Sequence, residues 1–89
     1  MFRITEQRAP GALVLKLEGR FSAACVKELD GCWREAMQAT TPIWVDLSDV
    51  DLVDIAGQEQ LTRMHRAGVR FVTRGCVMRE LVREISESH

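Results

Sequence analysis

The alternation of apolar and polar residues along the chain predicts four β-strands. Successive side chains of a strand point to opposite faces of a sheet, so strict alternation is typical of a strand buried on one face. The segments with this pattern are residues 2–6, 12–18, 43–47 and 69–73. Pro10 and Gly11 lie in the short segment 8–11, which is typical of a tight turn. The first two strands are therefore predicted to be antiparallel.

Apolar residues at intervals of three and four predict three helices. The first begins after Ser22, a favourable N-cap residue, and runs to about Ala39. Its predicted inward positions are Cys25, Leu29, Cys32, Trp33, Ala36 and Met37. The second begins at Ile55 after the N-cap Asp54, and it ends at Ala67 and Gly68.

The third predicted helix runs from Cys76 to about Ile85. Its predicted inward positions are Val77, Met78, Leu81, Val82 and Ile85. Residues 86–89 have no further apolar period, so the end of the chain, from about residue 85, is expected to fray.

These elements follow one another in the order ββαβαβα, which predicts an α/β domain with a four-stranded mixed sheet. A strand, a helix and a strand in succession place the two strands parallel, with a right-handed crossover. Strands covered on both faces are continuously apolar, whereas these alternate, so the helices are expected mainly on one face. We expect a single domain over residues 1–89.

The other face of the sheet is predicted to carry charged residues such as Lys16, Asp46 and Arg70, with Trp44 among them. Two interpretations of Trp44 stay open. Either another part of the chain covers it, or it belongs to an exposed apolar patch that binds a partner or a second copy in a homodimer.

Composition and charge narrow the classes of function. The 89 residues are 46% hydrophobic and 28% charged with a net charge of -1, which is typical of a soluble globular protein. Nucleic acid is not expected as a partner, because binding to phosphates needs a concentrated positive surface. No segment approaches the ~20 apolar residues of a membrane span, and Arg3 and Glu6 interrupt any N-terminal apolar run, so a cytoplasmic location is expected. Cys25, Cys32 and Cys76 lack paired spacing and are expected to be reduced and mostly buried.

The segment Pro42–Gly57, PIWVDLSDVDLVDIAG, is predicted to contain the functional site. Its strand leads through an acidic turn, residues 48–53, to the helix cap Asp54. A helix start of this kind presents backbone N–H groups and the positive end of the helix dipole to solvent. The segment is therefore a natural site for an anion or for a partner protein.

The element order and three local motifs resemble the STAS domain, the fold of anti-sigma-factor antagonists, which also occurs in sulfate transporters and in bacterial lipid-transport machinery. The motifs are LVLKLEGRF at 13–21, WVDLSDVDLVDIAG at 44–57 and VRFVTRG at 69–75. The resemblance covers about residues 13–85. Its most specific part is DLSDVDLVDIAG, which is similar to the family pattern D-L-S-x-V-x-x-[IVL]-D-S-[SA]-G.

The resemblance implies a regulatory surface at the start of the second helix. In the family, a phosphorylated Ser or Thr follows the second Asp of the motif, but Ile55 stands there in this chain and has no hydroxyl to accept a phosphoryl group. Ala56 and Gly57 keep the family pattern, whereas Gln58 replaces a residue that is usually apolar. Ser22 occupies the loop where relatives often carry an Asp.

No catalytic or metal site is expected. The acidic group Asp46, Asp49, Asp51 and Asp54 superficially resembles an oxygen-ligand loop, but it lacks the turn glycine and the bidentate Glu of an EF-hand. No glycine-rich phosphate loop is present either. No cofactor is therefore expected.

The leading hypothesis is a non-enzymatic regulatory module that acts by binding another protein. The resemblance implies an anti-sigma-factor kinase, or the ATPase of a lipid-transport ABC system, as that partner. The alternative is a module that binds a small ligand, such as a nucleotide or a lipid, at the same helix start. The residues expected at the contact are Ser22, Ser48, Asp49, Asp51, Asp54, Ile55, Ala56, Gly57 and Gln58. Ser48 is also the candidate phosphoacceptor, although turn hydrogen bonding is the ordinary role of such a serine.

Overall fold

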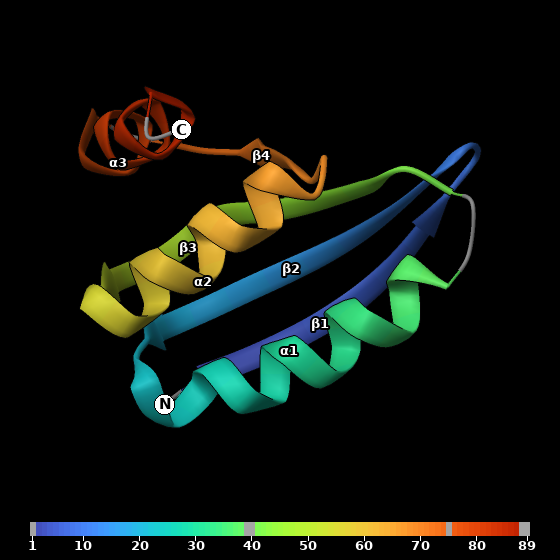
Figure 1. The fold of residues 1–89 in the computed structure, drawn as a ribbon, viewed down its shortest axis with the longest axis horizontal. Helices are drawn as coiled ribbons and strands as arrows, with labels where there is room; N and C mark the ends of the chain where they lie inside the picture. Colours follow the sequence, from blue (N-terminus) through green and yellow to red (C-terminus); the bar gives the residue numbers. More distant parts are fainter. Residues whose placement is uncertain (1, 39–40, 75, 88–89) are drawn as a thin grey trace.

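Four strands form one mixed sheet in the order β1-β2-β3-β4 (Figure 1). The computed structural model describes residues 2–38, 41–74 and 76–87, with the backbone alone for residues 76–78 and 86. The strands are β1 (Phe2–Ala9), β2 (Ala12–Phe21), β3 (Ile43–Val53) and β4 (Arg70–Val72). β1 and β2 are antiparallel, while β3 is parallel to both β2 and β4. The predicted order ββαβαβα and the mixed sheet are confirmed.

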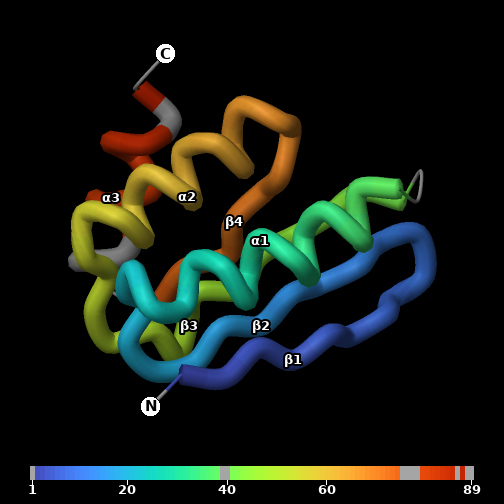
Figure 2. Tube along the Cα trace, turned by 60° about the horizontal axis from the view of Figure 1, so that its bottom comes forward, coloured from blue at the N-terminus to red at the C-terminus, as the bar shows by residue number. Residues whose placement is uncertain are grey.

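The three helices lie on one face of this sheet. They are α1 (Ala23–Met37), α2 (Ile55–Arg66) and α3 (Cys76–Glu87). Figures 1 and 2 show α1 and α2 side by side over the strands, with α3 beyond β4 and next to α2. The expectation that the helices cover mainly one face is therefore confirmed. α3 is longer than predicted, since its helix includes residues 86 and 87, and residues 88–89 lie outside the described part of the chain.

The core lies between the sheet and the helices, as the alternation predicts. The buried strand residues are Leu13, Leu15, Leu17, Phe21, Ile43, Val45, Leu47 and Val50. The helices meet them with Leu29, Ala36, Leu61, Met64 and Ile85. Met37 was expected to point inward, but it is 45% exposed at the last residue of α1.

The predicted cysteine burial is only partly met. Cys25 and Cys32 are free thiols, and both are half-buried. Burial is the main cause that raises the pKa of the Cys32 thiol. The side chains of Cys76, Val77 and Met78, also expected inward, lie outside the described residues.

The acidic segment 48–53 was predicted to be a turn, and this prediction is wrong. β3 continues through it to Val53 and pairs with residues 18–21 of β2. β2 is therefore longer than the predicted strand, which ended at residue 18. Register shifts between Lys16 and Glu18 and between Gly19 and Arg20 interrupt the simple alternation. Irregularities of this kind re-aim side chains, so Asp49 and Asp51 are exposed on either side of the buried Val50. β4, by contrast, is shorter than the predicted 69–73.

α2 begins in direct contact with the end of β2. A Cβ atom at Gly57 would lie 2.7 Å from the Phe21 carbonyl oxygen, which is closer than such atoms can approach. Phe21 is itself fully buried, and its ring stacks on Phe2 with 5.4 Å between centroids. Glycine at position 57 is therefore required by close packing of the backbone.

Gly57→Ala is expected to lower the free energy of unfolding by about 2 kcal/mol or more, because either α2 or the end of β2 must shift. Gly31→Ala is the matched control, since a Cβ at this exposed helix position meets nothing within 4 Å. It should raise stability by about 0.5–1 kcal/mol, through the higher helix propensity of alanine. Urea unfolding followed by circular dichroism measures both. Equal effects of the two substitutions would contradict the packing argument.

Candidate functional site

The carboxylate of Asp54 joins the starts of two helices. Its Oδ1 accepts a hydrogen bond from the Gly57 N–H at 2.8 Å, which caps α2 as predicted. Its Oδ2 accepts from the Ala23 N–H at 2.9 Å, at the start of α1. The Asp54 N–H in turn donates to the Phe21 carbonyl at 3.1 Å. The bond from Gly57 is the main cause, and the bond from Ala23 the next, that hold the pKa of Asp54 below its usual value.

Asp54 also explains why Ser22 does not act as predicted. Ser22 occupies the N-cap position of α1, but its side chain makes no capping hydrogen bond. Its hydroxyl instead lies 3.8 Å from the Cys25 sulfur. The Asp54 carboxylate supplies an anionic acceptor at both helix starts, so the amides of Ala23 and Gly57 are not open to an external anion as the sequence had suggested.

Ile55 is the most exposed large hydrophobic residue in the described part of the chain. It is 77% exposed at the first position of α2. Leu52, three residues earlier, is 54% exposed. Ala56 and Gln58 are half-buried, and Gly57 is buried. The helix start thus offers aliphatic surface at Leu52 and Ile55, while Gly57 has a packing role.

The acidic residues expected at the contact do not gather there. Asp49 forms an ion pair with Lys16 at 3.1 Å, and this contact is the main cause that raises the pKa of Lys16. Asp51 is exposed at the second register shift, and Ser48 is half-buried within β3, where its N–H donates to Asp46 Oδ1 at 2.9 Å. Across the described ranges, no three His, Cys, Asp or Glu side chains come together in a way that could hold a metal ion.

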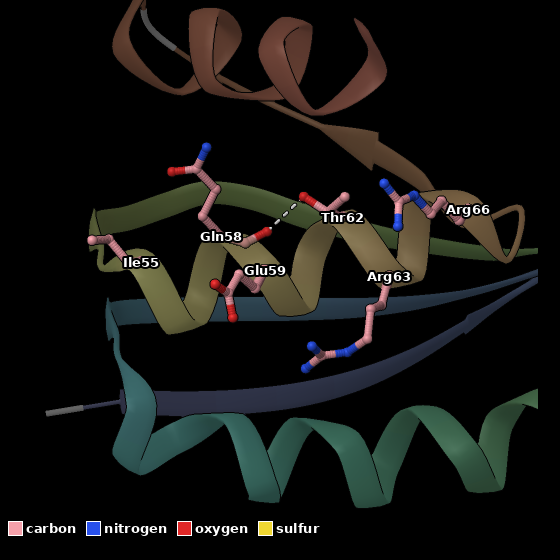
Figure 3. Close-up of a pocket in the computed structure, with 6 residues that line it drawn as sticks. All are labelled: Ile55, Gln58, Glu59, Thr62, Arg63 and Arg66. Atoms are coloured by element: carbon pink, nitrogen blue, oxygen red, sulfur yellow. Dashed lines mark hydrogen bonds between the residues drawn. The ribbon is translucent and has the colours of Figure 1, made fainter. Parts of the chain in front are cut away.

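A shallow hollow of about 550 Å³ runs along the outer side of α2. Six residues line it and are here called the α2 stripe: Ile55, Gln58, Glu59, Thr62, Arg63 and Arg66. Figure 3 shows Ile55 at the start of the helix and Arg66 near its end. In that view Glu59 and Arg63 point toward α1, and Gln58 points the other way. The Thr62 hydroxyl donates to the Gln58 carbonyl at 2.9 Å.

The contact residues expected from the sequence do not include four residues of the α2 stripe: Glu59, Thr62, Arg63 and Arg66. The helical period contains the signal, because positions 57, 60, 61 and 64 are buried and the stripe occupies the opposite side. Arg66 is exposed, and Arg63 is both exposed and held by a neighbour. The stripe therefore combines an aliphatic start with a basic end.

A polar network between α1 and α2 holds Arg63. Its guanidinium donates to the side-chain oxygen of Gln60, which is fully buried. The Gln60 amide donates to Asp30 at 3.3 Å, and Asp30 also accepts from Arg34 at 2.8 Å. Burial pushes the pKa of Asp30 upward, but the hydrogen bonds from Arg34 and Gln60 outweigh burial and hold the pKa below its usual value. The network orients Arg63 at the edge of the stripe.

Trp44 lies on the sheet face opposite the helices. Its ring is half-buried, and the Arg70 guanidinium lies 5.7 Å from the ring centroid. Helices α1, α2 and α3 all lie on the other face (Figure 2). The described segments thus leave the face around Trp44 uncovered.

The chain belongs to the STAS domain family. A sequence model of the family described as "Mlab, STAS domain" matches residues 4–86. A search among curated proteins finds no match. None of the described helices is long and apolar enough to cross a membrane.

Solved structures share this fold at low sequence identity. An anti-sigma factor antagonist from Mycobacterium paratuberculosis is 17% identical, with a TM-score of 0.82 over 97% of this chain and 79% of that one. The anti-sigma factor antagonist SpoIIAA in its unphosphorylated form is 19% identical, with a TM-score of 0.64 over 91% and 80%. An antisigma-factor antagonist STAS domain from Rhodobacter sphaeroides is 21% identical, with a TM-score of 0.60 over 83% and 86%. The predicted STAS fold is confirmed.

Asp54→Asn is expected to destabilise the protein in a pH-dependent way. The pKa of Asp54 in the folded protein lies below its usual value of 3.8. The contribution of the ionised carboxylate to the free energy of unfolding is therefore fully present at pH values above the usual pKa. It is lost as the pH falls through the lower pKa of the folded protein. The stability gap between the parent protein and the variant should stay constant from about pH 7 to pH 5 and shrink toward pH 2, as measured by urea unfolding.

Asp51→Asn provides the control, because it removes a carboxylate from an exposed position of the same segment. It should change the unfolding free energy little at neutral pH. A gap for Asp54→Asn that widens on acidification would show that the two amides do not depend on the ionised carboxylate.

Proposed function

We propose that this STAS domain is a non-enzymatic regulatory module that binds a partner protein through Leu52, Ile55 and the α2 stripe. The single observation that carries the proposal is the 77% exposure of Ile55 at the start of α2. An aliphatic side chain gains little by facing water, and a contiguous apolar surface rimmed by polar groups is typical of a contact site. Gln58, Glu59 and the two arginines supply such a rim.

The proposal assigns Ile55 the place of the family's phosphorylated hydroxyl. A phosphoryl group would add about -2 charge at this helix start, which an aliphatic residue can never carry. The contact surface therefore stays uncharged at position 55, and binding is constitutive or is regulated elsewhere. Ser48 is a poor candidate for an alternative phosphoacceptor, because it is half-buried within β3.

Two partner classes follow from the family. Similarity to anti-sigma factor antagonists supports an anti-sigma-factor kinase as the partner. The family description supports an accessory role beside the ATPase of a lipid-transport ABC system. Genes next to the one encoding this chain supply the first candidates of either class to purify.

A small ligand at the helix start is supported less well. Its best anchor would be the free amides of a helix N-terminus. Asp54 already bonds to the Gly57 and Ala23 amides, and its negative charge repels a second anion. Protein binding is therefore the better-supported function.

Ile55→Asp tests the contact surface. An acidic residue in the first turn favours a helix, so the variant should fold, while its charge replaces the aliphatic contact. Calorimetry with the purified kinase or ATPase partner should show affinity reduced about tenfold or more, equivalent to about 1.4 kcal/mol.

Met37→Asp is the matched control, because Met37 is an exposed apolar residue at the end of α1, away from the start of α2 (Figure 1). It should bind the same partner as the parent protein does. If Ile55→Asp binds with unchanged affinity, the contact surface lies elsewhere.

A further inference from the structure

The uncovered face of the sheet carries apolar side chains among charges of both signs. Trp44 and Val14 are half-buried there, and Val72 is 39% exposed. α1 and α2 pack over the opposite face, and α3 packs against α2 beyond β4, as Figures 1 and 2 show for the described chain. This face is separate from the α2 stripe, so a contact made through it is independent of the proposed function.

Strand register arranges this face in rows. A row here means residues that lie side by side on neighbouring strands. Between β2 and β3, the first row pairs Val14 with Trp44, and the second pairs Lys16 with Asp46. The third row pairs Glu18 with Asp49. Between β3 and β4, Arg70 lies beside Trp44 and Val72 beside Asp46. The charged residues of the rows are Arg3, Lys16 and Arg70 against Glu18, Asp46 and Asp49. Positive and negative side chains are equal in number, so the face is neutral and can complement itself.

We propose that this face binds a second copy of the same chain in a two-fold symmetric dimer. A two-fold axis parallel to the strands, between β2 and β3, exchanges the two members of each row. Trp44 then lies over Val14 of the second copy, and Lys16 lies over Asp46 of the second copy. Each contact occurs twice, as symmetry requires. The apolar contact in the first row and the opposite charges in the second row favour a second copy of the chain as the partner.

The third row limits the strength of the dimer. It brings Glu18 toward Asp49 of the second copy, a like-charge contact. Lys16 lies 3.1 Å from Asp49 within each copy and offsets part of this repulsion. Packed sheets also rotate by about 30° relative to each other, which separates outer rows more than central ones. The dimer is therefore weak and depends on protein concentration.

Complementary charge reversal tests this geometry. Lys16→Asp places like charges at both central contacts, and so does Asp46→Lys. Each variant alone should raise the dimer dissociation constant about tenfold or more, as measured by sedimentation equilibrium of the full chain. An equimolar mixture of the two variants restores opposite charges at both contacts and should associate like the parent protein.

Two further variants keep the test interpretable. Val14→Lys alters the apolar row without touching either charged residue, and it should likewise raise the dimer dissociation constant about tenfold or more. Lys27→Glu reverses an exposed charge on α1 and should leave dimerisation unchanged. Circular dichroism and thermal melts establish that each variant folds, and Ile55→Asp should dimerise normally.

The proposal is overturned if the parent protein stays monomeric at about 1 mM. It is equally overturned if the single charge reversals associate like the parent protein, or if their mixture associates no more tightly than either alone.

Discussion

The contact between Asp54 and the starts of two helices is the constraint on which the rest of the structure depends. The Asp54 carboxylate accepts hydrogen bonds from the amides of Ala23 and Gly57. The Asp54 amide donates a hydrogen bond to the Phe21 carbonyl. β2, α1, β3 and α2 therefore meet at one corner of the sheet. Because Gly57 has no side chain, α2 can approach the Phe21 backbone closely enough to close that corner.

This corner separates a packing role from a binding role within one short motif. Asp54 and Gly57 contact other groups of the domain, whereas the Ile55 side chain between them projects into solvent. A helix makes this possible, since neighbouring residues point about 100° apart around its axis. The family motif can therefore keep its structural residues while position 55 changes from a hydroxyl to an aliphatic group, and only the exposed surface is altered.

The two faces of the sheet have different chemistry for the same geometric reason. Alternation sends leucine, isoleucine and valine toward the helices and sends Lys16, Asp46 and Trp44 away from them. The α2 stripe and the uncovered sheet face are consequently independent surfaces. A partner on one leaves the other accessible, so a domain of this size has room for two contacts.

The sequence by itself determined the order of elements, the mixed sheet, the inward residues of β2 and the cap at Asp54, because periodicity and capping are local properties. Only the tertiary structure decided that residues 48–53 form a strand, since their pairing partners lie in β2 and the register shifts depend on both strands. It also decided that Asp54 reaches Ala23, 31 residues away in sequence, and that Gln60 is buried against Asp30 of α1. Such contacts join distant segments, and no local pattern specifies which segments meet.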